Sequence, residues 1–515
     1  MLAKLKTYSM LGIEAIPVEV EVDVSPSNSP KYLLVGLTEA AAKESTHRVE
    51  RALVNSGFMR PQDRVVVNLA PAELPKQAAS FDLPIALGML AGSAQIELDL
   101  FEEYAVVGEV SLEGSTRAAR GALSMAMAAA KQGDLKGIVV PAASAAEAAV
   151  VEELDVIAVS SLAEAVAFFT GELEIPPTPS RLDDLFRSFS MYDLDYADVC
   201  GQEMAKRALM IAAAGAHNLL MVGPPGSGKT MLAQRVPTIM PQLTTSESIE
   251  TTRIYSAMGL LKPGQPLMAT RPFRAPHHTI SNAGLVGGGN PPSPGEISMS
   301  HHGVLFLDEL PEFDRRTLEV LRQPLEDGVV TISRALTSAT FPCDFMLIAA
   351  LNPCPCGYRN DPRRNCMCLT GAVERYMNKI SGPLLDRIDI HIEVPAVPFS
   401  ELTSQQRGTS SQDIRDAVVV ARQRQWERYD KSNEMTFHPN GHLTSRQLRQ
   451  HCRLDARGLE LLRTSVNDLG LSARAHDKIL RVSRTIADLE DVADIQEHHV
   501  NEAVNYRLLD RQLWT

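Results

Sequence analysis

A glycine-rich segment, "HNLLMVGPPGSGKTML" (217–232), constrains the fold of this chain more than any other feature. The short apolar run from His217 to Val222 favours a buried parallel strand, and helix-forming residues resume after the glycines. Between them, every fixed position of G-x-x-x-x-G-K-[ST] is filled by Gly223, Pro224, Pro225, Gly226, Ser227, Gly228, Lys229 and Thr230. The backbone N–H groups of such a loop surround phosphates, Lys229 adds positive charge at the β and γ positions, and Thr230 offers a hydroxyl to Mg²⁺. We therefore expect an α/β fold that uses ATP and Mg²⁺.

Two later apolar runs end in polar residues that suit the same site. "GVLFLDEL" (303–310) is typical of a buried strand followed by Asp308 and Glu309, and "FMLIAALN" (345–352) ends in Asn352. Parallel sheets bind ligands at the carboxyl ends of their strands, so we expect these three side chains at the phosphates. Asp308 would hold Mg²⁺, Glu309 would polarise the attacking water, and Asn352 would hold that water or the γ-phosphate. The pattern predicts ATP hydrolysis, with a solvated strand end as the alternative for the acidic pair.

The composition is that of a soluble globular protein of about three domains. The 515 residues are 44% hydrophobic and 22% charged, which is ordinary for such proteins. No apolar run is long enough to span a membrane, and the N-terminus lacks a signal-peptide core, so we expect a cytoplasmic protein without a membrane partner. The net charge of −13 argues against a generally basic surface but is compatible with a local basic pore.

Shifts in composition divide the chain into domains. Residues 1–172 alternate β-rich runs with alanine-rich helical stretches, which predicts a separate α/β domain. Three prolines in 171–184 break both helix and strand, so we place a linker at 173–196. The nucleotide motifs then lie in a core at 197–394 with a parallel sheet, and 395–515 has a helical pattern.

Four of the seven cysteines crowd into "CPCGYRNDPRRNCMC". Cys354, Cys356, Cys366 and Cys368 would supply the four thiolates of a closed structural Zn²⁺ site. Each C-x-C pair is a tighter bite than the usual C-x₂-C, and reduced free thiols are the alternative.

Two histidine doublets, His277–His278 and His301–His302, are weaker candidates for a metal site. Adjacent side chains on an extended chain point to opposite sides, so a doublet rarely gives two ligands to one ion. We favour hydrogen-bonding roles near the ATP site for both doublets.

Several segments together resemble the magnesium-chelatase-like AAA+ ATPases of the ComM/YifB type. They are "VCGQEMAKRALMIAAAGAHNLLMVGPPGSGKT", "RPFRAPHHTIS", "SHHGVLFLDELPEF", "LIAALNPCPCGY" and "SGPLLDRIDIHIEVP". The resemblance covers nearly the whole chain and implies a multidomain α/β protein with an N-terminal Lon-protease-like domain, a P-loop AAA+ core and a C-terminal helical lid. It also implies a ring, usually a homohexamer, with each ATP held between neighbouring subunits.

The resemblance assigns two arginines to that shared ATP site. Arg387 in "LLDRID" corresponds to the arginine finger that reaches the next subunit's ATP, and Arg474 in "LSARAHDKIL" to the sensor-2 arginine. A local salt bridge to Asp386 or Asp389 is the alternative role for Arg387. Arg481 and Arg484 lie near the same helical face as Arg474, and either could be sensor 2 instead.

The first domain resembles the proteolytic domain of Lon, which uses a serine–lysine dyad. Ser80 falls near the nucleophile position, but the lysine position holds Leu123, and Lys131 lies on another turn of the same helix. Without an amine to activate the hydroxyl, we expect no peptidase activity and assign the domain to assembly or DNA guiding.

Residues 326–341 predict a β-hairpin, because two β-prone halves flank Arg334-Ala335-Leu336-Thr337. This hairpin is our evidence for the molecule on which the ring acts. In related ring helicases such a hairpin points into the pore, so Arg334 is our candidate DNA contact, with a plain surface arginine as the alternative. The glycine-rich stretch 262–298 suggests a second loop facing the pore. Arg359, Arg363 and Arg364 on the cysteine loop could also meet DNA.

The resemblance implies a helicase that promotes branch migration in DNA uptake and recombination. The alternative is a protein-remodelling motor like the chelatase subunit.

Overall fold

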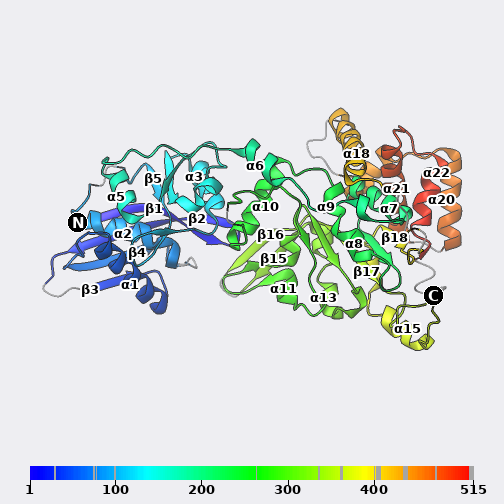
Figure 1. The fold of residues 1–515 in the computed structure, drawn as a ribbon, viewed down its shortest axis with the longest axis horizontal. Coiled ribbons are helices and arrows are strands. Elements are labelled where there is room, and N and C mark those ends of the chain that lie inside the picture. Colours follow the sequence, from blue (N-terminus) through cyan, green and yellow to red (C-terminus); the bar gives the residue numbers. More distant parts are fainter. Residues whose placement is uncertain are drawn as a thin grey trace.

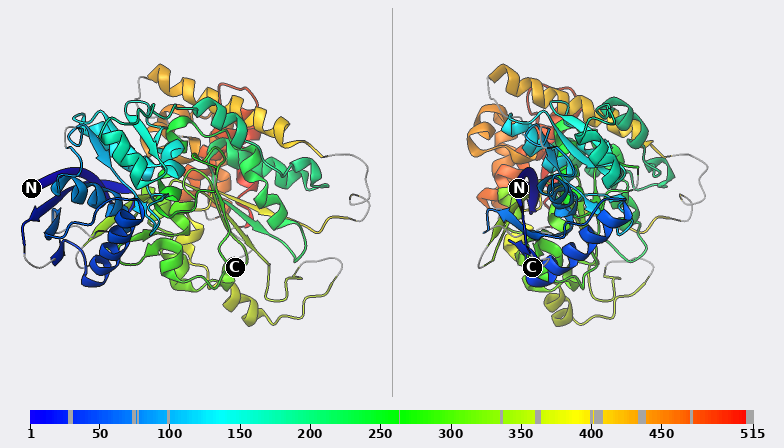
Figure 2. Two further views of the ribbon diagram at one scale, coloured as in Figure 1. Left: turned by 60° about the vertical axis from the view of Figure 1, so that its left-hand side comes forward. Right: turned by 90° about the vertical axis from the view of Figure 1, so that its left-hand side faces the viewer.

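The computed structural model places an N-terminal α/β region at one end, a central parallel sheet in the middle and a group of helices at the other end (Figure 1). In the view turned by 60°, the N-terminal region lies to the left of the central sheet (Figure 2). The structure describes residues 1–515 except 28–30, 73–75, 77, 98–99, 263, 335–336, 360–363, 399–400, 402–407, 433–438, 470–471 and 510–515.

The N-terminal region contains a four-stranded sheet of order β1-β2-β4-β3 and a three-stranded parallel sheet of order β5-β8-β9. Valines occupy every second position from Val18 to Val24 of β2, and all are buried because this face of the strand packs against helix α2, which is buried throughout. The approach is close: a Cβ on Gly88 would lie 2.6 Å from Cγ2 of Val22. The elements are β1 (Leu2–Leu11), β2 (Glu14–Ser25), β3 (Lys31–Val35), α1 (Glu39–Asn55), β4 (Arg64–Ala70), α2 (Asp82–Gly92), β5 (Tyr104–Val106), β6 (Glu109–Val110), β7 (Thr116–Arg117), α3 (Ala122–Gln132), β8 (Gly137–Pro141), α4 (Ala142–Ala148), β9 (Asp155–Val159) and α5 (Leu162–Phe169).

The segment after α5 differs from the expectation in one respect. Part of 171–184 was predicted to be free of helix, but α6 (Leu182–Phe189) begins inside it. Leu182 and Phe186, four residues apart on one helical face, pack against the N-terminal core, and the three prolines lie before the helix, where they do not interrupt it.

The central sheet has the order β11-β14-β17-β10-β18, and every strand pair in it is parallel. The predicted strands at 217–222, 303–307 and 345–351 are confirmed, and the residues of β10, β14 and β17 are all buried. The structure therefore has the mixed α/β fold with parallel sheets that the sequence predicts. The elements are α7 (Glu203–Gly215), β10 (Leu219–Val222), α8 (Lys229–Gln234), α9 (Val236–Ile239), α10 (Thr245–Ala257), β11 (Phe273–Arg274), β14 (Val304–Leu307), α13 (Arg315–Glu319), α14 (Pro324–Asp327), β17 (Met346–Leu351), α15 (Thr370–Met377), α16 (Gly382–Leu385) and β18 (Ile390–Glu393).

Two hairpins are inserted into this core and lie side by side. The predicted hairpin is present as β15 (Val329–Ser333) and β16 (Ser338–Pro342), and the stretch 262–298 holds α11 (Asn282–Val286), β12 (Gly287–Gly288), β13 (Ser293–Pro294) and α12 (Glu296–Met299). A Cβ on Gly287 would lie 2.5 Å from Cδ1 of Ile332, so the two hairpins are in close contact. The β1–β2 turn of the N-terminal region also meets β16, since a Cβ on Gly12 would lie 3.1 Å from Phe341.

The C-terminal region is helical, as predicted. Helices α18 and α21 pack against α7 beside the central sheet, and α20 packs on α22. Among the described residues, no helix has the length and apolar character needed to cross a membrane. The elements are α18 (Ser411–Ser432), α19 (Ser445–His451), α20 (Ala456–Leu469), α21 (Ala473–Leu489) and α22 (Glu497–Asn505).

Candidate ATP site

The phosphate-binding loop joins β10 to α8 at the carboxyl edge of the central sheet. Gly226 and Gly228 have φ angles of 75° and 91°, a left-handed conformation that glycine adopts without strain. Lys229 begins α8 and is 7% exposed. Its Nζ donates to the carbonyls of Gly223 at 2.7 Å and Pro224 at 2.9 Å, and to Oδ1 of Asn352 at 3.2 Å. The structure thus brings Asn352, from β17, to the loop lysine.

Thr230 and Asp308 meet as the sequence predicts. The Thr230 hydroxyl donates to Oδ2 of Asp308 at 2.7 Å, across 78 residues of chain. Two hard oxygen donors at the end of a parallel strand suit Mg²⁺, which prefers oxygen ligands. Burial lowers the pKa of the Lys229 ammonium, and the carboxylates of Asp308 and Glu309 oppose that shift by favouring the charged form.

Glu309 lies at the same edge and faces a histidine. Its backbone has a φ of 52°, which turns the chain sharply after β14, and its Oε2 lies 3.4 Å from Nδ1 of His278. The His277–His278 doublet is therefore near the candidate site, as expected.

The other doublet is elsewhere, which corrects the expectation. His301 and His302 precede β14 and lie at its opposite end, where both Nε2 atoms approach Oε2 of Glu250, at 3.3 and 2.9 Å. The expectation that neighbouring histidines diverge is wrong for both doublets, because the ring centres lie 3.8 Å apart in His301–His302 and 4.1 Å apart in His277–His278. In the first of these pairs the backbone of His302 has a φ of 54°.

A hollow of about 460 Å³ adjoins the phosphate-binding loop. Its walls come from 198–202 before α7, from 225–228 of the loop and from Ala396 and Val397 after β18. Met231 and Leu232 of α8 also line it, as do Tyr358 and Arg364 from the cysteine-rich segment. Arg364 is one of three arginines that could meet DNA, and the sequence pattern does not indicate that it lies beside the phosphate-binding loop. Of the other two, Arg363 lies outside the described residues.

Arg387 and Arg474 line a second hollow, of about 660 Å³, that includes no residue of the phosphate-binding loop. The Arg387 guanidinium is paired with Glu326 rather than with either neighbouring aspartate, and it also donates to the Pro383 carbonyl. Its side chain is 11% exposed, and its Nε has no partner among the described residues. Arg474 is 64% exposed, and its NH1 lies 4.0 Å from Asp386.

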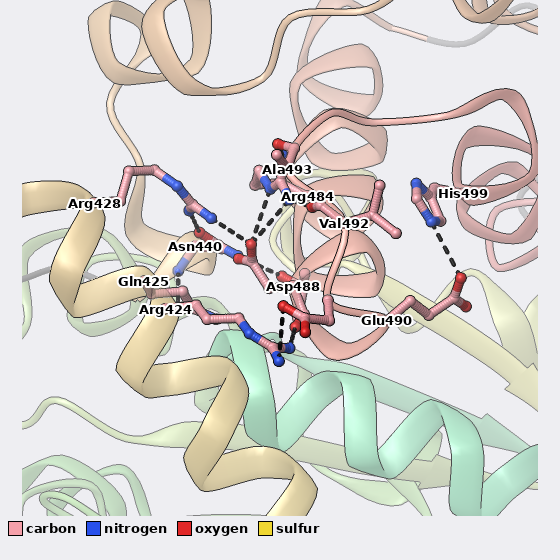
Figure 3. Close-up of polar contacts among 12 residues, drawn as sticks. Arg424, Gln425, Arg428, Asn440, Arg484, Asp488, Glu490, Val492, Ala493 and His499 are labelled. Carbon is pink, nitrogen blue, oxygen red and sulfur yellow. Dashed lines mark hydrogen bonds and ion pairs between the residues drawn. The ribbon is translucent and has the colours of Figure 1, made fainter.

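The two other sensor-2 candidates are occupied within the chain. Arg481 donates to the Leu443 carbonyl at 2.6 and 3.1 Å. Arg484 is 2% exposed and uses Nε, NH1 and NH2 to bind Asp488, the Ala493 carbonyl and the Val492 carbonyl (Figure 3). Arg481 also lines the second hollow, but Arg474 is the exposed arginine of the three.

The four cysteines converge as the zinc prediction requires. The Sγ atoms of Cys354, Cys356, Cys366 and Cys368 all lie within 4.8 Å of one another. Cys354 is fully buried in the hydrophobic core on one face of the central sheet, and the other three cysteines are half-buried.

The three residues singled out in the Lon-like domain lie in different environments. Ser80 is half-buried in the turn before α2, Leu123 is fully buried, and Lys131 is exposed in the last turn of α3.

Arg334 of the predicted hairpin is exposed at the end of β15, and its backbone N–H donates to the Thr337 carbonyl at 2.8 Å. Ala335 and Leu336, which complete the predicted tip, lie outside the described residues.

Comparison with known families matches three consecutive parts of the chain to magnesium chelatase. Residues 195–402 match magnesium chelatase, subunit ChlI; residues 20–144 match subunit ChlI of Mg-chelatase; and residues 408–507 match the subunit ChlI C-terminal family.

Individual relatives extend over the whole length. The chain is 41% identical over 514 residues to the protein YifB of Escherichia coli, covering 99% of this chain and 98% of the relative. It is 41% identical over 520 residues to the competence protein ComM of Haemophilus influenzae, with the same coverage. The magnesium-chelatase 67 kDa subunit of Chlorobaculum parvum is 27% identical over 160 residues, 31% of this chain and 23% of that subunit.

Proposed function

This chain belongs to the magnesium-chelatase-like AAA+ family of YifB and ComM, and we propose that it is an ATP-driven, ring-forming DNA motor. In this proposal it acts as a helicase or branch-migration translocase in DNA recombination and natural transformation. The name of the ComM relative, a competence protein, supports the pathway. Membership of this family itself points to ATPase activity with ATP and Mg²⁺.

The observation that carries the chemistry is the convergence of Lys229, Thr230, Asp308 and Asn352 at one edge of the sheet. Lys229 would bind the β- and γ-phosphates, and Thr230 and Asp308 would hold Mg²⁺, whose charge neutralises phosphate oxygens when it is bound. Glu309 would accept the proton of the attacking water, with His278 orienting its carboxylate.

The placement of Arg387 and Arg474 supports assembly into a ring. Both line a hollow that the chain's own phosphate-binding loop does not reach, so neither is positioned to serve ATP bound to the same chain. We propose that this hollow faces the ATP of a neighbouring subunit, where a guanidinium stabilises the charge of the transferred phosphoryl group. Hydrolysis would then require assembly.

The two adjacent hairpins favour DNA over a protein as the load. Arg334 is exposed at the end of β15, and the NH2 of its guanidinium would lie 3.5 Å from a Cβ on Gly288 of the second hairpin. A charged arginine beside a glycine-rich turn is suited to contact a phosphate backbone, which is recognised by charge rather than by sequence. A protein-remodelling motor related to the chelatase subunit is the second candidate, favoured by the match of all three regions to chelatase families.

ATPase measurements with and without DNA distinguish the two candidates. We expect single-stranded or branched DNA to stimulate hydrolysis, and strand displacement on forked or four-way substrates to require ATP. Lys229→Ala should leave turnover near background, whereas Glu309→Gln should still bind ATP and form rings but fail to hydrolyse. An ATPase that DNA does not stimulate would contradict the DNA-motor proposal and favour protein remodelling.

A further inference from the structure

The geometry of the four cysteine sulfurs is close to that of a zinc site. Sγ of Cys354 lies 3.3 Å from that of Cys356, and Sγ of Cys366 lies 3.6 Å from each of them. Thiolates bound tetrahedrally at about 2.3 Å from zinc lie about 3.8 Å apart, whereas a disulfide needs about 2.05 Å. The separations therefore fit a shared ion far better than a disulfide.

The turn that carries the first two cysteines contacts the phosphate-binding loop. Cys354 follows Asn352 by two residues, and a turn closes where the Gly357 N–H donates to the Cys354 carbonyl at 2.9 Å. Gly357 has a φ of 82°, and a Cβ there would lie 2.5 Å from Cδ of Pro225. Only a glycine fits at this contact, so the cysteine turn presses against the loop that would hold the phosphates.

Two side chains next to the cluster extend along the nucleotide hollow. NH1 of Arg364 donates to the Tyr358 hydroxyl at 2.7 Å, and the guanidinium carbon lies 4.9 Å from the centre of the tyrosine ring. Both residues line the hollow together with Pro225 and its neighbours. An aromatic ring and a planar cation are suited to a nucleotide, because one can stack on a base and the other can pair with phosphate.

We propose that Cys354, Cys356, Cys366 and Cys368 bind one Zn²⁺ ion, and that this ion holds Tyr358 and Arg364 in the wall of the nucleotide hollow. The segment between Asn352 and α15 has no helix or strand among its described residues, so a metal cross-link supplies the order that secondary structure does not. The role of the two side chains rests on the proposed binding of ATP. Zinc occupancy then controls the affinity for nucleotide, although the ion itself does not contact the phosphates.

Metal analysis tests the first half of the proposal. Native protein should contain about one zinc per chain by elemental analysis, as a closed four-thiolate site requires. Cys354→Ser combined with Cys366→Ser should lose the metal, whereas Cys343→Ala, which removes a buried thiol outside the cluster, should keep it. The proposal would be overturned if the purified native protein contained no zinc.

Titration with a fluorescent ATP analogue tests the second half. Native protein stripped of zinc by a chelator, then returned to Mg²⁺ buffer, should bind the analogue about tenfold more weakly, and added Zn²⁺ should restore affinity. Tyr358→Ala and Arg364→Ala should weaken binding by up to the same factor while zinc content and unfolding temperature stay unchanged. Arg375→Ala, an exposed arginine on α15, is the matched control and should change neither property.

The outcomes separate this inference from the DNA-motor proposal. If zinc-free protein and the Tyr358 and Arg364 variants bind the analogue with native affinity, the inference is overturned, whatever DNA does to the ATPase. If zinc controls affinity but DNA does not stimulate hydrolysis, the motor proposal fails and the zinc inference stands.

Discussion

Two arginine-rich regions of this molecule differ in what their guanidinium groups contact. In the C-terminal helices, Arg484 is buried and all three of its nitrogens have partners, and Arg428 joins it on the carboxylate of Asp488 (Figure 3). In the hollow beside α16, Arg474 is 64% exposed with one contact at 4.0 Å, and Arg387 has an Nε without a partner among the described residues.

The difference indicates two uses of one residue type. A buried arginine whose donors are all satisfied by its own chain holds helices together and has nothing left to offer a ligand. An arginine that is exposed, or that is held by an exposed carboxylate as Arg387 is by Glu326, has donors that can turn to a phosphate from outside the chain. We therefore expect substitutions in the first region to change stability and substitutions in the second to change hydrolysis.

Arg387→Ala should produce the largest effect and test the second half of that comparison. A finger supplied to a neighbour's ATP is worth about 10³- to 10⁵-fold in turnover, or roughly 4–7 kcal/mol of barrier. The unfolding temperature should change little, because the Glu326 side chain is 53% exposed and solvent screens its ion pair with Arg387. Steady-state ATPase and thermal unfolding measure the two quantities.

The matched control is Arg463→Ala, an arginine of α20 that is 74% exposed and 3.9 Å from Glu460. It should leave both quantities unchanged. Near-native turnover in Arg387→Ala would show that this guanidinium serves only its own chain.

Asp488→Ala tests the first half of the comparison. The carboxylate is 2% exposed and accepts from Arg484, Arg428 and Asn440. Its removal leaves the buried Arg484 guanidinium and the half-buried Arg428 guanidinium without their charge partner, which costs about 3–5 kcal/mol of unfolding free energy. Denaturant unfolding measures this loss, and ATPase per folded chain should stay close to native. A stable variant with impaired hydrolysis would reverse the assignment.

Arg474→Ala should have a smaller effect, confined to hydrolysis. We expect turnover to fall by about tenfold, or about 1.4 kcal/mol, because an exposed side chain contributes less than a finger held in place. Arg481→Ala is the comparison, since its donors bind the Leu443 carbonyl and its loss should lower stability instead. If Arg481→Ala rather than Arg474→Ala impaired hydrolysis in a stable protein, sensor 2 would be Arg481.

The sequence predicts those parts of the site that follow directly from a strand. Asp308 and Asn352 come immediately after buried apolar runs, and parallel strands end at the same edge of a sheet. The contacts of Asp308 with Thr230 and of Asn352 with Lys229 can therefore be predicted once the strands are known to be parallel. The hairpin of β15 and β16 is predictable for a similar reason, because its two β-prone halves are neighbours in the chain.

Contacts between distant loops are not predictable in this way. The fit of Gly357 against Pro225 joins residues more than a hundred positions apart, and no periodic pattern encodes it. The pairing of Arg387 with Glu326 instead of an adjacent aspartate likewise depends on how α14 and α16 are placed. The His301–His302 doublet does not lie at the ATP site, because it precedes β14 and so lies at the end of that strand opposite Asp308. The left-handed backbone at His302 is a separate feature that cannot be read from residue type.

Arg334→Ala should have the smallest effect on the free ring and extends the comparison to the hairpin. Arg334 is exposed like Arg474 but lies away from both hollows, so its removal should leave basal ATPase and assembly unchanged. If it binds a DNA phosphate, the variant should lose DNA-stimulated turnover and strand displacement. The slope of log affinity against log salt should also flatten by about 0.7–0.9 for each phosphate that the protein no longer neutralises, without a change in sequence preference.

The matched control for the hairpin is Arg322→Ala, an exposed arginine paired with Glu319 rather than carried on β15. Binding across a salt series, and ATPase with and without DNA, should be measured for both variants and the parent. Because an arginine that binds phosphate acts here through its charge, Arg334→Lys should recover most of the salt dependence that Arg334→Ala removes. An Arg334→Ala protein with native stimulation, slope and unwinding would mean that exposure alone does not mark a functional arginine, and the protein-remodelling alternative would gain support.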